Sequence, residues 1–239
     1  MPIRRRIPVL ESEGLTDIGL RRKGNDDFLL RSARKQLFIV ADGVGGAEHG
    51  NVASREAAQK MHELFDPRLK NLGEAMSGAH EHVKLVNVTR QTAGSTILQR
   101  RKKEQYECAT TLTALHIDRN GMAHIAQAGD SRAYLFRGNV LKQITKDQID
   151  PVNPNGLGQY VGAGELTPVV TRGLTKPRDL FLLCTDGLTK HVRDELIHDV
   201  LHQCATEQLN LKEATRTLIK EAKNRGGSDN ITAVIVRVK

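Results

Sequence analysis

The chain has 239 residues, of which 38% are hydrophobic and 27% are charged, a composition typical of a globular protein. Its longest apolar runs, such as residues 180–184, are far shorter than the roughly 20 residues that a membrane-spanning helix needs. The basic N-terminus is not followed by the apolar segment of a secretory signal, so we expect a cytoplasmic protein with no membrane partner. The three cysteines lack metal-finger spacing, which fits a reducing compartment.

The net charge of +8 raises the question of a nucleic-acid partner. However, the chain has no Trp, three Tyr and five Phe, so it offers few aromatic platforms on which bases could stack. We therefore expect no nucleic-acid partner and interpret the charge as a general attraction for anionic partners. Because repeats and low-complexity linkers are lacking, we expect one domain over residues 1–239, with a flexible basic tail at residues 1–12, and a monomer.

The first half of the chain predicts strands followed by helices. Residues 15–30 have the pattern of two strands joined by a polar turn, and residues 37–41 form an apolar run typical of a buried strand. Apolar residues at helical spacing indicate a helix over residues 52–65, which Pro67 follows. A longer helix is expected within residues 71–104.

The next part of the chain changes to short apolar runs separated by turn residues, which predicts an antiparallel meander. Its strands are expected at residues 109–117, 122–128, 133–136 and 140–144. Residues 147–175 are rich in Pro, Gly and Asn, so we expect an irregular surface excursion there.

The C-terminal part predicts a buried strand, two helices and a last strand. These elements are expected at residues 179–184, 191–205, 211–224 and 231–238. Because strands and helices come in blocks rather than in alternation, the fold class is α+β, with antiparallel sheets covered by helices.

One pattern recurs along the chain: an Asp stands beside a glycine or another small residue at a strand end or turn. It occurs at Asp42, Asp130, Asp186 and Asp229, and the adjacent Asp26 and Asp27 form a fifth such place. A single occurrence is an ordinary turn, but five indicate carboxylates that converge at one rim of a sheet. Converging carboxylates repel unless cations lie between them, and oxygen ligands favour Mg²⁺ or Mn²⁺ over zinc.

Arg22 lies just before the Asp26 and Asp27 pair and has two possible tasks. Its guanidinium matches phosphate oxygens in a bidentate geometry, which would suit a site where two metal ions activate water for displacement at phosphorus. Alternatively, Arg22 forms a surface ion pair with the neighbouring carboxylates.

The chain resembles the PPM-type (type 2C) metal-dependent serine/threonine protein phosphatases, in particular their compact bacterial single-domain branch. Six motifs follow the family's order through nearly the whole chain. They read GLRRKGNDD from residue 19, FIVADGVGG from 38, ATTL from 109, GDSRAY from 129, CTDGL from 184 and GSDNIT from 227. The resemblance implies a four-layer α-β-β-α sandwich, in which two antiparallel sheets are flanked by helix pairs, with a dinuclear metal site at one end.

The resemblance also implies the metal ligands. These are the carboxylates of Asp26, Asp27, Asp42, Asp130, Asp186 and Asp229, and the carbonyl of Gly43. Asp42 would bridge two Mn²⁺ or Mg²⁺ ions, Asp186 and Asp229 would complete the first, and Gly43 would bind the second. Asp26 or Asp27 would serve the second ion, directly or through water. Asp130 with Asp186 matches a third metal site of bacterial members.

The implied reaction is hydrolysis of phosphoserine or phosphothreonine in proteins, by attack of a metal-bridging water without a phosphoenzyme. Arg22 and Asp42 would be the catalytic residues, with Arg22 binding the substrate phosphate. The implied partners are phosphorylated proteins and the pathway of a cognate serine/threonine kinase in bacterial signalling.

Three positions depart from the family pattern. Asp26 stands where Glu is usual, which leaves open whether Asp26 or Asp27 is the ligand. Val44 stands where His is frequent, so His49 is the nearest alternative for a leaving-group acid. The flap over residues 147–175 is shortened. A phosphoprotein-binding module and a metal-dependent nuclease are the alternative functions.

Overall fold

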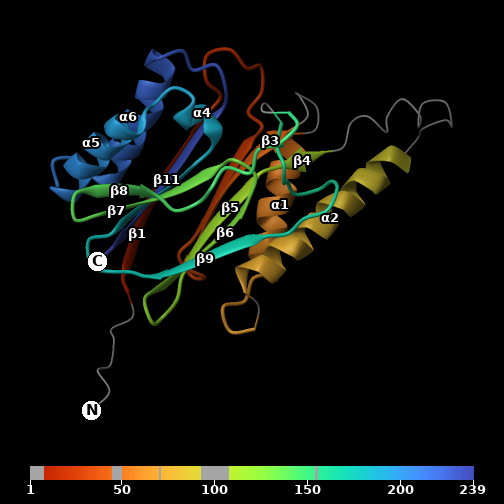
Figure 1. Cartoon of the computed structure of the whole chain (residues 1–239), viewed down its shortest axis with the longest axis horizontal. Coiled ribbons are helices and arrows are strands. Elements are labelled where there is room, and N and C mark those ends of the chain that lie inside the picture. The colour runs from red at the N-terminus through yellow and green to blue at the C-terminus, as the bar shows by residue number, and fades with distance from the viewer. Residues whose placement is uncertain (1–7, 45–49, 70, 93–107, 154–155) are drawn as a thin grey trace.

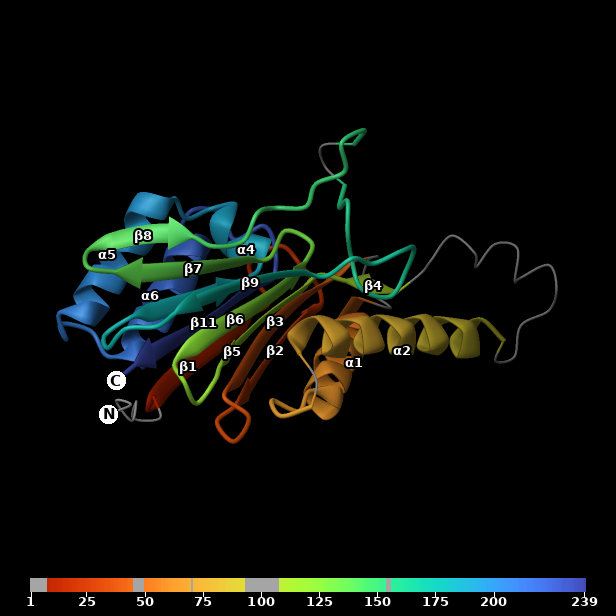
Figure 2. The same ribbon diagram turned by 60° about the horizontal axis from the view of Figure 1, so that its bottom comes forward.

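The structure is a computed structural model, and it describes residues 8–44, 50–69, 71–92, 108–153 and 156–239. Two antiparallel sheets lie face to face, with one group of helices on the outside of each (Figure 1). The view in Figure 2 shows α1 and α2 grouped together on one side of the molecule, away from α5 and α6. This is the expected α-β-β-α sandwich. Within the described ranges, no helix is both long and apolar enough to cross a membrane.

The first sheet contains five strands in the order β1-β11-β10-β7-β8. The strands are β1 (Leu10–Asp17), β11 (Ile231–Val238), β10 (Leu180–Cys184), β7 (Arg132–Arg137) and β8 (Val140–Gln143). The helices α5 (Asp194–Ala205) and α6 (Leu211–Asn224) pack on its outer face, and the short α4 (Asp186–Thr189) follows β10. The strand β1 lies at one edge, where Leu10 pairs with Val238.

The second sheet has six strands, with β2-β3-β5-β6-β9 in order and β4 paired to β3. The strands are β2 (Asp27–Ser32), β3 (Leu37–Val44), β4 (Ala109–Thr110), β5 (Leu112–Ile117), β6 (Met122–Ala128) and β9 (Val169–Leu174). The helices α1 (Gly50–Leu64) and α2 (Leu72–Thr92) cover its outer face.

The period of two in β3 explains the position of the site. Leu37, Ile39 and Ala41 point toward α1 and α2, whereas Phe38 and Val40 point into the core between the sheets. Residue 42 follows the same alternation, so Asp42 continues the inter-sheet face of β3 at the end of the sandwich. On β10 the same alternation sends Phe181 and Leu183 into the inter-sheet core.

Several sequence-based expectations need correction. The four strands of residues 109–144 do not form one meander, because β5 and β6 pair in one sheet while β7 and β8 pair in the other. The chain changes sheets at Gly129–Ser131, where Gly129 has a φ of +100° that allows the sharp crossing. The excursion at residues 147–175 ends in the strand β9, and residues 10–12 of the predicted tail belong to β1.

The helices begin or end a few residues from their predicted bounds. The helix α1 starts at Gly50, before the predicted residue 52, and α5 starts at Asp194 rather than at 191, because Leu188 to Arg193 complete α4 and its exit turn. The helix α2 is described to Thr92, and the remainder of the predicted 71–104 helix lies outside the described residues. The bounds of α6 agree with the prediction, and a capping box between Asn210 and Glu213 starts this helix.

Candidate metal centre

Asp42 is fixed by its backbone to two threonines of the neighbouring segment. Its N–H donates to Oγ1 of Thr111 at 3.0 Å, and its carbonyl accepts from the Thr111 N–H and the Thr110 hydroxyl, both at 2.9 Å. Ser131 Oγ lies 2.7 Å from Thr111 Oγ1 and extends this network to the crossing at Asp130. The threonines of the ATTL motif therefore hold the backbone of Asp42 and leave its carboxylate free.

Asp27 faces Asp42 in the register of β2 and β3. One oxygen, Oδ2, accepts hydrogen bonds from the hydroxyls of Thr185 at 2.8 Å and Thr232 at 2.7 Å. The other oxygen, Oδ1, is buried without a hydrogen-bond partner among the described residues. Burial raises the pKa of Asp27 to about 7, against the stabilising effect of these two hydroxyls.

Asp186 and Asp130 approach the same point from the first sheet and from the crossing between sheets. Asp186 is the first residue of α4, and its Oδ1 is also buried without a described partner. Burial, followed by the negative charge of Asp186, raises the pKa of Asp130 to about 6. Asp130 and Asp186 are therefore close enough for their charges to interact.

The electrostatics of Asp42 show that four other carboxylates converge on it. Burial raises the pKa of Asp42 well above its ordinary value, and the charges of its carboxylate neighbours raise it further. In order of effect, these neighbours are Asp27, Asp186, Asp229 and Asp130. Five of the six predicted carboxylates are thus brought together, and we call these five the carboxylate cluster.

Two cations balance part of this negative charge. The Lys190 ammonium lies 2.6 Å from Asp186 Oδ2 and 2.9 Å from Asp229 Oδ2, so it bridges two members of the cluster. Arg22 contacts the other oxygen of Asp229 at 2.8 Å, and 48% of the Arg22 side chain is exposed. Burial alone would raise the pKa of Asp229, but the hydrogen bonds from Lys190 and Arg22 lower it.

Asp26, the sixth predicted carboxylate, is held at the start of α1. Its Oδ1 accepts a hydrogen bond from the Asn51 N–H at 3.1 Å, in the first turn of α1, where the helix dipole favours a negative charge. Its N–H donates to Asn230 Oδ1 at 2.8 Å. The Asn230 amide also donates to the carbonyls of Ile18 and Gly24, both at 2.9 Å, so Asn230 positions the loop that carries Arg22.

Gly43 allows β3 to approach the start of α1. A Cβ on Gly43 would lie 2.2 Å from the Gly50 carbonyl oxygen, which no side chain could tolerate. The Gly43 N–H donates to the Asp26 carbonyl at 3.1 Å. The glycine after Asp42 is therefore required for packing, whether or not its carbonyl binds a ligand.

The donor chemistry of the cluster fits a hard divalent cation. Its side-chain donors are all carboxylate oxygens, and the unpartnered Oδ1 atoms of Asp27 and Asp186 have lone pairs that no described residue satisfies. In the part of the chain that the structure describes, no three His, Cys, Asp or Glu side chains are arranged to hold a metal ion as they stand. Lys190 and Arg22 occupy oxygens of Asp186 and Asp229.

The sequence did not identify several residues that build the site. Thr185 and Thr232 continue the inter-sheet faces of β10 and β11, so their hydroxyls reach Asp27. Strand periodicity could have placed these two hydroxyls inside the sandwich, but it could not have assigned their acceptor. Lys190 lies four residues after Asp186, and nothing in its local sequence distinguishes it from a solvated lysine. His49 lies outside the described residues.

The segment after β8 is anchored beside Asp130. Arg132 forms a bidentate ion pair with Asp147, with its Nη2 2.7 Å and its Nε 2.9 Å from the carboxylate. The Gln148 N–H donates to the Gly129 carbonyl, and its side chain accepts from the Gly129 N–H at 2.7 Å. These contacts fix the start of the 147–175 excursion against the crossing.

Comparison with known proteins identifies the class to which this fold and site belong. The family described as Protein phosphatase 2C matches residues 21–222. The protein phosphatase PhpP of Streptococcus pneumoniae serotype 2 is 29% identical over 256 residues, which cover 95% of this chain and 97% of PhpP. The serine/threonine protein phosphatase PstP of Mycobacterium tuberculosis is 32% identical over 250 residues, which cover 96% of this chain and 45% of PstP.

A solved structure supports the same assignment. The catalytic domain of serine threonine protein phosphatase PstP in complex with two manganese ions has a TM-score of 0.78 and 28% identity, covering 97% of this chain and 99% of that chain. The chain belongs to the protein phosphatase 2C family. The expected fold and the expected enzyme class, a protein serine/threonine phosphatase, are therefore confirmed.

The raised pKa of Asp27 predicts how the stability of the metal-free protein depends on pH. Because the folded-state pKa of about 7 exceeds the unfolded value of about 3.9, the native state binds more protons between these values and loses stability as the pH rises through 7. Asp27→Asn keeps an oxygen that accepts from Thr185 and Thr232 but carries no charge. We expect it to stabilise the metal-free protein at pH 8 by roughly 2 kcal/mol, or about 4–8 °C in Tm.

Thermal unfolding in EDTA, from pH 5 to pH 8, measures this effect. The difference in Tm between variant and wild type should be about a third of its full value at pH 5, because the unfolded carboxyl already ionises there, and should grow until the pH passes about 7. Asp199→Asn, at an exposed position on α5, controls for the loss of a carboxylate elsewhere. A pH-independent difference for Asp27→Asn would contradict the assigned protonation of Asp27.

Proposed function

We propose that the carboxylate cluster is a dinuclear Mn²⁺ or Mg²⁺ centre at which this phosphatase hydrolyses phosphoserine and phosphothreonine in proteins. The observation that carries the proposal is the convergence of five carboxylates, two of them with unpartnered buried oxygens, at the end of a protein phosphatase 2C fold. The manganese ions of the related PstP catalytic domain support the choice of metal.

The roles of the chain's own residues follow from their positions. Asp42 would bridge the two ions, because it lies central to the cluster, and Asp186 and Asp229 would complete the first ion's ligands. Asp27 and the Gly43 carbonyl would serve the second. Bound ions would supply charge neutralisation and an activated water for attack on phosphorus. The hydroxyls that hold Asp27, and the threonines that hold Asp42, keep the carboxylates in place.

Asp26 and Asp130 would have further roles at the metal centre. Asp26 would act indirectly, because its carboxylate already accepts a hydrogen bond at the start of α1. Asp130 would bind a third ion together with Asp186, since the negative charge of Asp186 acts on Asp130 at the crossing between the sheets. The flap that starts at Asp147 borders this position.

Arg22 would bind the substrate phosphate. Its partner is Asp229 rather than the adjacent Asp26 and Asp27, so the ion pair that the sequence suggested forms with a different carboxylate. About half of the Arg22 side chain reaches solvent, and a guanidinium there can pair with two phosphate oxygens.

The biological setting is also part of the proposal. Phosphoprotein substrates require a kinase that forms them, so the enzyme would oppose a cognate serine/threonine kinase. We further propose that the chain acts as a monomer in the cytoplasm.

The first test is Mn²⁺-dependent hydrolysis of a phosphothreonine peptide by the wild type and by Asp42→Asn. Loss of the bridging carboxylate should lower kcat by about 10²–10³-fold, because the charge that balances the metals is removed. Asp199→Asn should match the wild type. Full activity in Asp42→Asn would refute the bridging role, and an inactive wild type with added Mn²⁺ would favour a phosphoprotein-binding module.

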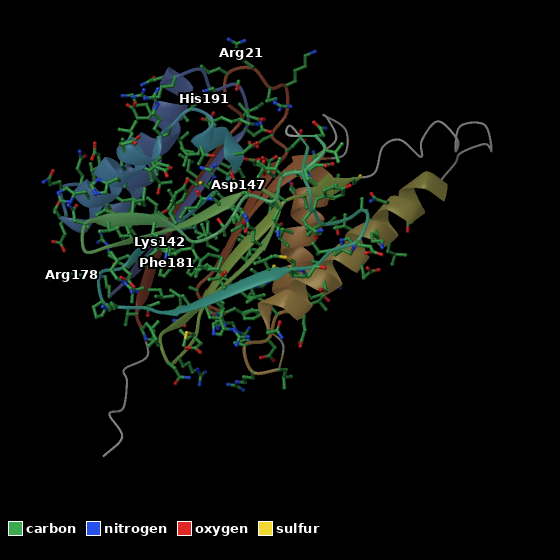
Figure 3. All side chains as sticks on the ribbon, viewed as in Figure 1. Arg21, Lys142, Asp147, Arg178, Phe181 and His191 are labelled. Atoms are coloured by element: carbon green, nitrogen blue, oxygen red, sulfur yellow. The ribbon has the colours of Figure 1, made fainter. Side chains whose placement is uncertain are left out.

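The second test separates phosphate binding from ion pairing at Arg22. Arg22→Ala should lower kcat/KM for the phosphopeptide by about tenfold to a hundredfold, while changing Mn²⁺ affinity much less, because the guanidinium contacts the substrate rather than the metal. Arg21→Ala, an exposed neighbour on the same loop, is the matched control (Figure 3). Unchanged kinetics in Arg22→Ala would show that Arg22 does not bind the phosphate and serves as a surface ion pair.

The third test concerns Lys190, whose ammonium competes with a metal for Asp186 and Asp229. We expect Lys190→Gln to tighten Mn²⁺ binding, measured by calorimetric titration, by about tenfold, since no cation then has to leave these carboxylates. Lys142→Gln removes an exposed lysine on β8, away from the cluster, and should leave the affinity unchanged (Figure 3). Equal or weaker binding by Lys190→Gln would show that Lys190 does not compete with the metal.

A further inference from the structure

A groove of about 630 Å³ opens beside the carboxylate cluster. Its lining residues are Thr189, Lys190, His191, Arg193, Glu195, Leu196 and Arg225. Six of them follow Asp186 closely in the chain, and Arg225 precedes Asp229 by four residues. His191 joins the two segments, because its Nε2 accepts a hydrogen bond from the Ser228 N–H at 3.0 Å. The groove is therefore built from the same two segments that carry Asp186 and Asp229.

The lining of this groove, which we call the basic groove, is rich in positive charge. Lys190, Arg193 and Arg225 are cationic, and Glu195 is the acidic residue among the lining side chains. Arg193 is exposed, and its guanidinium has no ion-pair or hydrogen-bond partner within the described ranges. The Arg225 side chain is 53% exposed, and its ion-pair partner among the described residues is Glu221, at 3.4 Å. Two guanidinium groups are therefore available to a ligand from solution.

Lys190 connects the basic groove to the proposed reaction site. Its side chain lines the groove, while its ammonium contacts Asp186 and Asp229 of the cluster. A peptide that presents a phosphorylated residue to the cluster must continue along the surface on both sides of that residue. On one of these two sides, the peptide would pass along the positively charged basic groove.

We propose that the basic groove binds an acidic side chain that flanks the phosphorylated residue of the protein substrate. The inference rests on the proposed phosphatase function and adds a preference for phosphorylation sites with nearby Asp or Glu. Arg193 and Arg225 would pair with the substrate carboxylate, a geometry for which the planar guanidinium is suited. A basic flank would instead meet like charges, so the groove selects against it.

The test compares five phosphothreonine peptides of equal length: one carries Ala on both flanks, two carry Glu and two carry Lys, each on the N-terminal or the C-terminal side of the phosphothreonine. With Mn²⁺ present, wild-type kcat/KM should be about fivefold to tenfold higher for one Glu-flanked peptide than for the Ala peptide, and lower for its Lys counterpart. The double variant Arg193→Gln/Arg225→Gln should lose this preference through KM. It should keep its kcat on the Ala peptide, because neither arginine contacts the carboxylate cluster.

The matched control, Lys142→Gln/Arg178→Gln, removes two positive charges elsewhere on the molecule, as Figure 3 shows. It should retain the preference for Glu, and raised salt should weaken that preference in the wild type. Equal wild-type rates on all five peptides would overturn the groove's role while leaving the phosphatase function intact. Equal loss in both double variants would also overturn it, in favour of net charge. If no peptide is hydrolysed, both the function and the subsite are wrong.

Discussion

Mutual repulsion among buried carboxylates is the constraint on which this end of the molecule depends. Asp27 and Asp42 enter from one sheet, Asp186 and Asp229 adjoin the other, and Asp130 lies where the chain crosses between them. These segments are anchored by apolar residues that fill the core, so the backbone positions of the carboxylates are fixed by the fold. The fold thus forces negative charges together, and only protons, lysine and arginine side chains, or metal ions can relieve the repulsion.

Without metal ions, the site offsets this repulsion differently at different depths. At the deepest position, Asp27 receives two hydroxyl hydrogen bonds, and its raised pKa shows that these do not fully offset burial. Nearer the surface, Lys190 and Arg22 neutralise Asp229. The metal-free arrangement therefore keeps its least satisfied oxygens, on Asp27 and Asp186, at the buried side of the cluster. A divalent cation would gain most from these oxygens.

Most of the fold could be predicted from the sequence, because apolar residues recur at strand or helix spacing wherever one face of an element is buried. The alternation in β11 and the helical spacing of α6 gave the observed bounds of both elements. The strand β9 was missed because residues 169–174 are mostly exposed at the edge of the sheet, where packing does not impose an apolar pattern. The predicted meander over residues 109–144 was wrong, because the residues of a turn do not determine in which of the two sheets the next strand pairs.

The site was predictable to the extent that its residues follow strands. Asp42, Asp186 and Asp229 could be grouped because each adjoins an apolar strand. The difference between Asp26 and Asp27 could not be settled that way, since adjacent residues point to opposite faces, and only the position of α1 shows that Asp26 meets a helix start. Lys190 escaped notice because its role depends on Asp229, which is 39 residues away in the chain.

The cations at the rim connect metal binding to substrate binding. Lys190 contacts one oxygen of Asp229, and Arg22 contacts the other. A metal ion that bound to Asp229 would replace these contacts, so neither cation would be a permanent partner of this carboxylate. If Asp229 binds a metal ion, as we propose, both side chains would lose a partner while remaining next to the proposed reaction site. Their charges would then become available to an anionic substrate: Arg22 would meet its phosphate, and Lys190 would add to the positive charge of the basic groove. The repulsion inside the sandwich and the attraction at its rim are therefore two consequences of the same crowded carboxylates.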